Sequence, residues 1–190
     1  MSFYEEIEKS VRILKKGKNL LYPTDTVWGL GCDAFNIKAI EKIYKIKNRS
    51  FSKTMILLVE SMDRLYELVE EIPFFAKKIL QENHRKKPVT IVYDNPRKII
   101  YKLNPQAKTL AIRLTMDPFC SRLIKNLDRP IISTSANLSG FPTPKSFCEI
   151  SPYILNKIDY AVNFRRKEIS SYSSSSILKI VSNKVKILRM

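Results

Sequence analysis

The pattern of apolar and polar positions along the chain predicts a mixture of helices and strands. Apolar residues recur every three or four positions from Tyr4 to Leu14, which predicts a helix that ends at Gly17. Asp117 can cap another helix and Pro118 can be its first residue, so DPFCSRLIKNL is expected to be helical. Further helices are expected after Asn36, at about 62–69, after Pro73 and over 145–155.

Short apolar or β-branched runs predict the strands. These runs are NLLYP, TMILLV, PVTIVYD, TLAIRLT and RPIIS, followed by YAVNF, SSILKIV and KVKILRM near the C-terminus. TDTVWGLGCDAF is expected to be irregular. Strands and helices mix without strict alternation, and no Pro-, Gly- or Ser-rich linker divides them. The pattern therefore predicts a layered α/β (mixed α+β) fold with a twisted mixed sheet, in a single domain over residues 1–190.

Composition narrows the class of protein. The 190 residues include 34 Lys and Arg against 18 Asp and Glu, a net charge of +16. This excess favours polyanionic partners such as nucleic acid, nucleotide or an anionic membrane, although an A/T-biased genome would also enrich Lys. No apolar run is long enough to span a membrane. The three cysteines (Cys32, Cys120, Cys148) are far apart and show no metal-ligand spacing, so a reduced, cytoplasmic protein without structural zinc is expected.

Small polar residues gather where two predicted strands end. Residues 24–26 (TDT) follow the run NLLYP, and Ser133, Ser135 and Asn137 alternate in PIISTSANLSG. On an extended strand end these three side chains would share one side. Such groups suit a site that offers hydroxyl and amide donors to an anionic ligand, but they also suit turns stabilised by side-chain hydrogen bonds.

Three basic residues lie near these stretches. Lys47 and Arg49 follow a predicted helix, where they could form a phosphate clamp or simply offset the charge of a helix C-terminus. Arg113 lies in an apolar strand and could reach a carboxylate or phosphate, or face solvent. The sequence has no G-x-S-x-G, Walker A or G-x-G-x-x-G motif, and the single histidine, His84, is expected to be exposed and noncatalytic.

Together these stretches resemble the YrdC-like family in its short form. YPTDTVWGLGCDA, KIKNRS, PVTIVY, LAIRL and PIISTSANLSG occur in the family's order and spacing over roughly 20–140, with a fainter continuation into SSSSILKI and KILRM. The resemblance implies a three-layer domain whose large twisted mixed sheet is flanked by helices. The chain departs from the family at Ser50, at 86–88 and at Met190, and SSYSSSS replaces a glycine-rich segment, which puts the role of Ser175 in doubt.

The resemblance also implies an activity. The family condenses L-threonine, bicarbonate and ATP into L-threonylcarbamoyladenylate and pyrophosphate, the first step of a tRNA modification next to the anticodon. Partner proteins, the tRNA threonylcarbamoyl-transferases, then use the product. Mg²⁺ would accompany ATP, without a metal held by the protein. The implied catalytic residues are Lys47 and Arg49; the implied ATP-binding residues are Lys47, Arg49, Thr90, Ser135 and Asn137; the implied threonine-binding residues are Thr24, Arg113, Ser133 and Ser175.

Two alternatives to a synthase stay open. A noncatalytic module that binds tRNA or double-stranded RNA would suit the net charge of +16. A carbamoyl-transfer domain of hydrogenase maturation would be expected inside a much longer chain. Release of pyrophosphate only when threonine and bicarbonate are both present would distinguish an enzyme from an RNA-binding module.

Overall fold

A computed structural model describes residues 2–51, 53, 55–82, 88–94, 96–97, 108–170, 174–181 and 184–189. His84 lies outside them. Within these residues one sheet has the order β7-β1-β2-β6-β3-β5-β4-β8-β9. Its strands are β1 (Leu20–Tyr22), β2 (Gly29–Asp33), β3 (Ile56–Val59), β4 (Val89–Asp94), β5 (Thr109–Leu114), β6 (Ile131–Ser135), β7 (Tyr160–Ala161), β8 (Ser176–Val181) and β9 (Lys184–Arg189). The helices are α1 (Phe3–Lys15), α2 (Ile37–Lys47), α3 (Met62–Leu68), α4 (Phe74–Glu82), α6 (Pro118–Leu127) and α7 (Pro152–Leu155), with a 3₁₀ turn, η1 (Phe147–Glu149).

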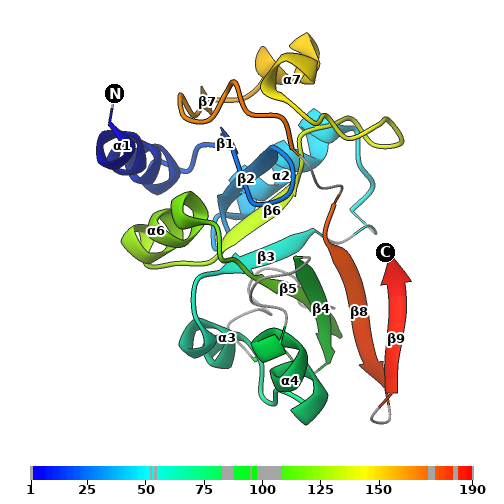
Figure 1. The fold of residues 1–190 in the computed structure, drawn as a ribbon. Coiled ribbons are helices and arrows are strands. Elements are labelled where there is room, and N and C mark those ends of the chain that lie inside the picture. Colours follow the sequence, from blue (N-terminus) through cyan, green and yellow to red (C-terminus); the bar gives the residue numbers. More distant parts are fainter. Residues whose placement is uncertain are drawn as a thin grey trace.

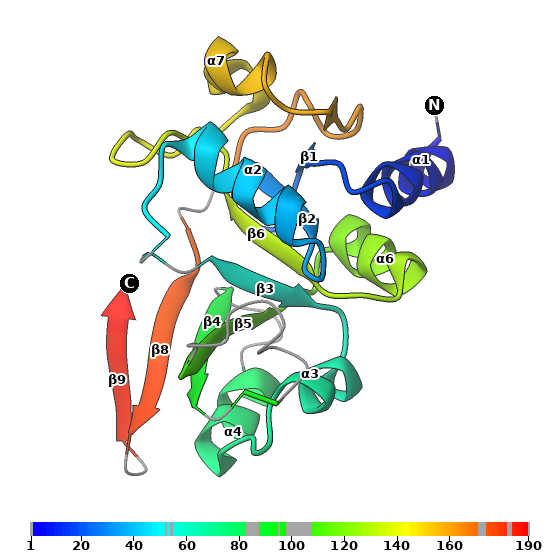
Figure 2. The same ribbon diagram turned by 180° about the vertical axis from the view of Figure 1, so that it is seen from behind.

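The sheet is mixed, as the sequence predicts. β1 pairs with β7, β3 with β5 and β4 with β8 in parallel, and the other neighbouring pairs are antiparallel. Helices lie on both sides of the sheet (Figures 1 and 2), which gives the three layers expected. None of the described helices combines the length and hydropathy that crossing a bilayer requires.

Local sequence signals fix several helix ends. Asp117 accepts a hydrogen bond from the backbone N–H of Cys120 at 2.9 Å, and Pro118 opens α6 as predicted. Asn36 caps α2, which ends at Asn48 with a left-handed backbone (φ 48°). This reversal redirects the chain immediately before Arg49.

Two expectations for the elements are wrong. Residues 145–155 do not form one helix, because Ser151 and Pro152 start a new helix after η1. The glycine-rich stretch expected to be irregular contains β2, which pairs with β1 and β6. A Cβ at Gly31 would lie 2.9 Å from the Tyr22 ring and 2.5 Å from the carbonyl oxygen of Ile132, so glycine lets a large aromatic side chain cross this strand.

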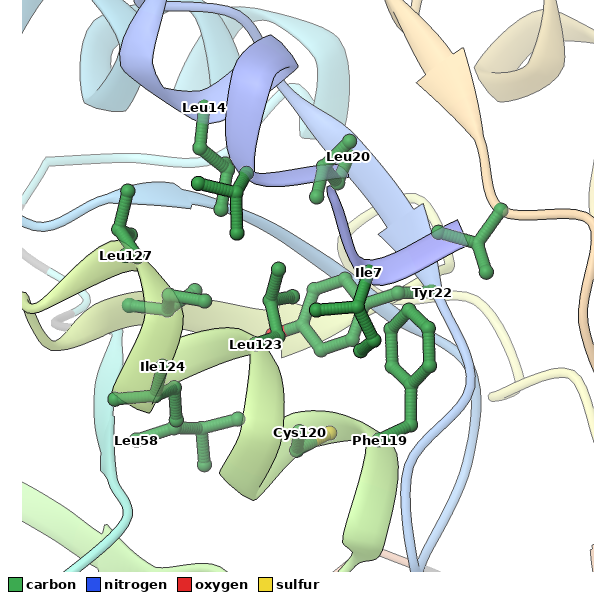
Figure 3. Packing of buried hydrophobic residues seen from close by; sticks show 13 residues of the cluster. Ile7, Leu14, Leu20, Tyr22, Leu58, Phe119, Cys120, Leu123, Ile124 and Leu127 are labelled. Atoms are coloured by element: carbon green, nitrogen blue, oxygen red, sulfur yellow. The ribbon is translucent and has the colours of Figure 1, made fainter. Parts of the chain in front are cut away.

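One face of the sheet is covered over only part of its width. The helices α1 and α6 pack on β1, β3 and β6 through a cluster that includes Tyr22 and Leu58 (Figure 3). The opposite face packs on α2 and, further along, on α3 and α4. In β5 the buried Ile112 faces α3 and α4, so Arg113 points to the other side, beyond the reach of α1 and α6. A cleft forms on this side.

Candidate active site

The cleft lies where the open part of the sheet meets the loop between β1 and β2. Residues 24, 26–29, 49, 55–56, 113, 133–135, 174–175, 177 and 189 line it, and its volume is about 140 Å³. A second hollow of about 180 Å³ lies on the other side of the same loop. The fold therefore brings together four of the motifs that the sequence singles out.

The loop of residues 24–28 is held by its own hydrogen bonds. Thr24 Oγ1 donates to the carbonyl oxygen of Val27 at 2.7 Å and accepts from the backbone N–H of Thr26 at 3.0 Å. Thr24 thus stabilises a turn and also lines the cleft. The interpretation of this motif as a hydrogen-bonded turn is confirmed, and its role in binding stays a prediction.

Arg113 is a buried cation at the cleft wall, with 4% of its surface exposed. It forms an ion pair with Asp25, and its Nη1 donates to Thr26 Oγ1 at 3.1 Å. Burial lowers the pKa of Arg113 below its usual value. Its Nε has no hydrogen-bond partner among the described residues. A buried guanidinium with a spare donor is suited to bind a carboxylate.

Lys47 points into the protein rather than into the cleft. Its Nζ donates to the carbonyl oxygens of Ser135 and Asn137, each at 2.5 Å, and reaches Asn137 Oδ1 at 3.3 Å. Burial, followed by the neighbouring charge of Arg49, lowers the pKa of Lys47 to about 7. Its ammonium therefore fastens the end of α2 to the loop after β6.

The polar residues after β6 are linked to one another and to the core. Ser133 and Ser135 line the cleft, whereas Asn137 lies beyond the end of β6 and is not among the lining residues. Ser133 Oγ accepts from the Tyr22 hydroxyl at 2.7 Å, and burial raises the pKa of Tyr22, which keeps this donor protonated. Ser135 Oγ donates to Asn137 Oδ1 at 2.5 Å. The serine hydroxyls therefore have fixed directions before any ligand binds.

Of the remaining predicted residues, Ser175 and Arg49 line the cleft and Thr90 does not. Thr90 and Ser175 are buried, and their hydroxyls are 2.8 Å apart. Ser175 thus connects the buried Thr90 to the cleft. Arg49 also lines the cleft. The sequence interpretation missed Arg189, which belongs to the run KILRM and also lines the cleft.

The described residues offer neither a thiol nor a metal centre at this site. Cys32 and Cys120 are buried, Cys148 is exposed, and none of them lines the cleft. No group of three potential metal-ligating side chains occurs in the part of the chain that the structure describes. The residues that line the cleft include no carboxylate.

Comparison with known proteins gives consistent matches. The family model Sua5_yciO_yrdC, described as "Telomere recombination", matches residues 12–190. Threonylcarbamoyl-AMP synthase of Pseudoalteromonas translucida is 33% identical over 165 residues, covering 86% of this chain and 88% of the relative. The enzyme of the same name from Riesia pediculicola is 34% identical over 137 residues, covering 71% and 73%.

Solved structures match the fold over nearly the whole chain. A Sua5 structure from P. abyssi has a TM-score of 0.88 and 25% identity, covering all of this chain and 57% of the other. This chain thus spans little more than half the length of that protein. YciO of E. coli has a TM-score of 0.78 and 22% identity, covering 96% and 87%.

Proposed function

The chain belongs to the Sua5_yciO_yrdC family, and we propose that it is an L-threonylcarbamoyladenylate synthase. It condenses L-threonine, bicarbonate and ATP into threonylcarbamoyl-AMP and pyrophosphate, the first step of threonylcarbamoyl modification of tRNA. The observation that carries this proposal is a cleft lined by small hydroxyl side chains, a buried arginine and a second arginine. The chain also shares 33% identity with a threonylcarbamoyl-AMP synthase.

Arg113 marks the end of the cleft that binds the threonine carboxylate. Its unpartnered Nε supplies a donor, and the ion pair with Asp25 keeps the guanidinium in place. Thr24, Ser133 and Ser175 add hydroxyl groups around it. A buried polar pocket of this kind is suited to an amino acid whose own hydroxyl needs partners.

Arg49 and Ser135 mark the end that binds the phosphates of ATP. Lys47 is beneath this surface and holds Ser135 and Asn137 in position. Thr90 orients Ser175 through the hydrogen bond between their hydroxyl groups. Asn137 accepts from Ser135 and donates to the carbonyl oxygen of Phe141, so it orients Ser135 at the ATP site proposed here.

The chemistry requires alignment rather than a covalent intermediate. The threonine amine adds to the carbon of bicarbonate or CO₂, and water is released when bicarbonate is the source. A carbamate oxygen then attacks the α-phosphorus, the bond to the β-phosphate oxygen breaks, and pyrophosphate leaves with the electron pair. The arginines supply charge for this transfer, and the fixed hydroxyls orient the reactants.

Mg²⁺ enters this scheme as part of the substrate MgATP. The lining residues do not fit a resident metal, because no carboxylate is among them. The product is a mixed anhydride, which transferase proteins consume when they modify tRNA. We place the reaction in the cytoplasm because its eventual acceptor is tRNA.

The test is product formation from defined substrates. The protein is incubated with MgATP, ¹³C-bicarbonate and threonine, and the labelled adenylate is measured by mass spectrometry, with each substrate omitted in turn. Threonine should be preferred over serine by about 10- to 200-fold, the range for one methyl group in a fitted pocket. Absence of labelled adenylate from the complete mixture with folded protein, or its formation without threonine, would contradict the proposal.

A further inference from the structure

The hydroxyl group of Tyr22 reaches the wall of the cleft from inside the core. Tyr22 is fully buried and belongs to the apolar cluster that α1 and α6 form on the sheet (Figure 3). It lies on β1, whereas Ser133, which accepts its hydrogen bond at 2.7 Å, lies on β6. Gly31 of the intervening β2 pairs with Ser133, and the ring crosses β2 there because glycine has no side chain. A buried aromatic residue is thus connected to the cleft.

The hydrogen bond from Tyr22 decides what Ser133 can offer to a ligand. Burial raises the pKa of Tyr22 above its usual value, so its hydroxyl group keeps the hydrogen that it donates. Ser133 Oγ is the acceptor, and no described residue accepts the hydrogen of the Ser133 hydroxyl in turn. Ser133 is only 5% exposed, and it lines the cleft. Its hydroxyl group is therefore held as a donor to a ligand in the cleft.

This donor belongs to the same part of the cleft as Arg113. Burial has the largest effect on the pKa of Tyr22, and the charge of Arg113 opposes it, so the guanidinium lies near the Tyr22 hydroxyl. Arg113 and Ser133 line the same hollow, and Arg113 Nε is also a donor without a partner among the described residues. The backbone of Ser133 is fixed, because β6 pairs with β2 on one side and β3 on the other. Two donors held in place are suited to a carboxylate.

We propose that Tyr22 is a positioning residue for threonine, because its hydrogen bond makes the Ser133 hydroxyl a donor to the threonine carboxylate beside Arg113. This assignment rests on the synthase function proposed above. The ammonium group of threonine has donors only, so a hydroxyl group that presents its hydrogen does not bind it. The amine is thereby left free to lose a proton and add to the carbon of bicarbonate or CO₂.

Tyr22 could instead serve only the packing of the core, and three variants separate the two roles. Tyr22→Phe keeps the ring and removes the hydroxyl group alone. Ser133→Ala removes the group through which Tyr22 acts. Tyr160→Phe is the matched control, because the Tyr160 hydroxyl donates to Glu6 at 2.5 Å, its ring packs against the same cluster, and it does not line the cleft.

The experiment has two readouts. Calorimetry measures the affinity of the free protein for L-threonine, which does not depend on turnover, and steady-state kinetics measure adenylate formation with threonine and ATP varied separately. Tyr22→Phe should weaken threonine binding about 3- to 10-fold, the range for one hydrogen bond, with little change in KM for ATP. Tyr160→Phe should bind threonine like wild type. The double variant should bind threonine no more weakly than Ser133→Ala, because Tyr22 acts through Ser133.

Contrary outcomes are defined for each comparison. If Tyr22→Phe binds threonine as tightly as Tyr160→Phe does, Tyr22 serves the core alone and the assignment is wrong. It is also wrong if the losses from Tyr22→Phe and Ser133→Ala add in the double variant, or if the wild-type protein binds no threonine. If the wild-type protein binds threonine but forms no adenylate, the synthase proposal fails, and the threonine affinities still decide the role of Tyr22. Melting temperatures of Tyr22→Phe and Tyr160→Phe distinguish lost stability from lost binding.

Discussion

The pH dependence of stability should reveal the charge of Lys47. This side chain is 1% exposed, and burial with the nearby Arg49 lowers its pKa from 10.5 to about 7. Replacing it by methionine keeps a similar length and removes the titrating group. Lys47→Met also leaves the carbonyl oxygens of Ser135 and Asn137 without this donor, at a cost of about 1–3 kcal/mol each. The variant should therefore be destabilised but still folded near neutral pH.

The pKa values of Lys47 in the folded and unfolded protein decide whether stability rises or falls with pH. Below about pH 7 the lysine is protonated in both states, and the cost of burying its charge is constant. Between the folded and unfolded pKa values the unfolded chain binds more protons, so stability rises with pH. From about pH 7 to pH 9 the gain is about 2 kcal/mol. The buried thiol of Cys32 acts oppositely: its pKa is raised, so stability falls as the unfolded thiol ionises.

The assay is urea unfolding of wild type and Lys47→Met at several pH values over this range. Subtracting the two free energies of unfolding cancels Cys32 and every other group that both proteins share. The advantage of wild type should grow by about 2 kcal/mol over that interval. A difference that stays constant within about 0.5 kcal/mol would refute the reasoning and show that the surrounding oxygens keep Lys47 charged throughout.

Three further predictions concern the site and the surface. Arg49→Ala should lower the rate of adenylate formation by about 10²–10³. The control Arg12→Ala, on the exposed side of α1, should not change this rate. If the two variants form adenylate at similar rates, Arg49 is not part of the phosphate site. In the native protein a thiol reagent should modify Cys148 alone, and Cys32 and Cys120 should react only after denaturation. Cys148→Ser should keep full activity. If this variant folds but loses activity, the thiol of Cys148 has a role in the reaction. Any binding of RNA should be weak and independent of sequence, with log affinity falling linearly with log salt; tight binding to one sequence at high salt would contradict this.

Local signals in the sequence located the polar strand ends. Alternation alone placed Ser133 and Ser135 on one side of a strand, and β6 has this geometry. The mixed sheet also followed from the order of apolar runs. These inferences needed only the period of a strand or the capping of a helix, which act over a few residues.

Features that depend on distant pairing were not predictable in the same way. The strand β2 looks irregular in sequence because its glycines are explained only by Tyr22 on the neighbouring strand. The direction of the Lys47 side chain depends on carbonyl groups 88 and 90 residues away. Arg189 lies opposite Ile177 because the pairing of β9 with β8 skips Leu188, and the run KVKILRM by itself does not indicate this shift. In each case the deciding contact is tertiary.

The loop between β1 and β2 is held from both of its sides. The loop of residues 24–28 is fastened from inside by Arg113 and from outside by Arg165, which bonds the Thr24 carbonyl oxygen at 3.5 Å and pairs with Asp117 at 2.5 Å. Ser170 donates to the carbonyl oxygen of Thr26 from the same outer side. A preformed pocket loses little entropy on binding and can reject an amino acid that differs by one methyl group. A loop fixed in this way would support selectivity for threonine in the synthase proposed above.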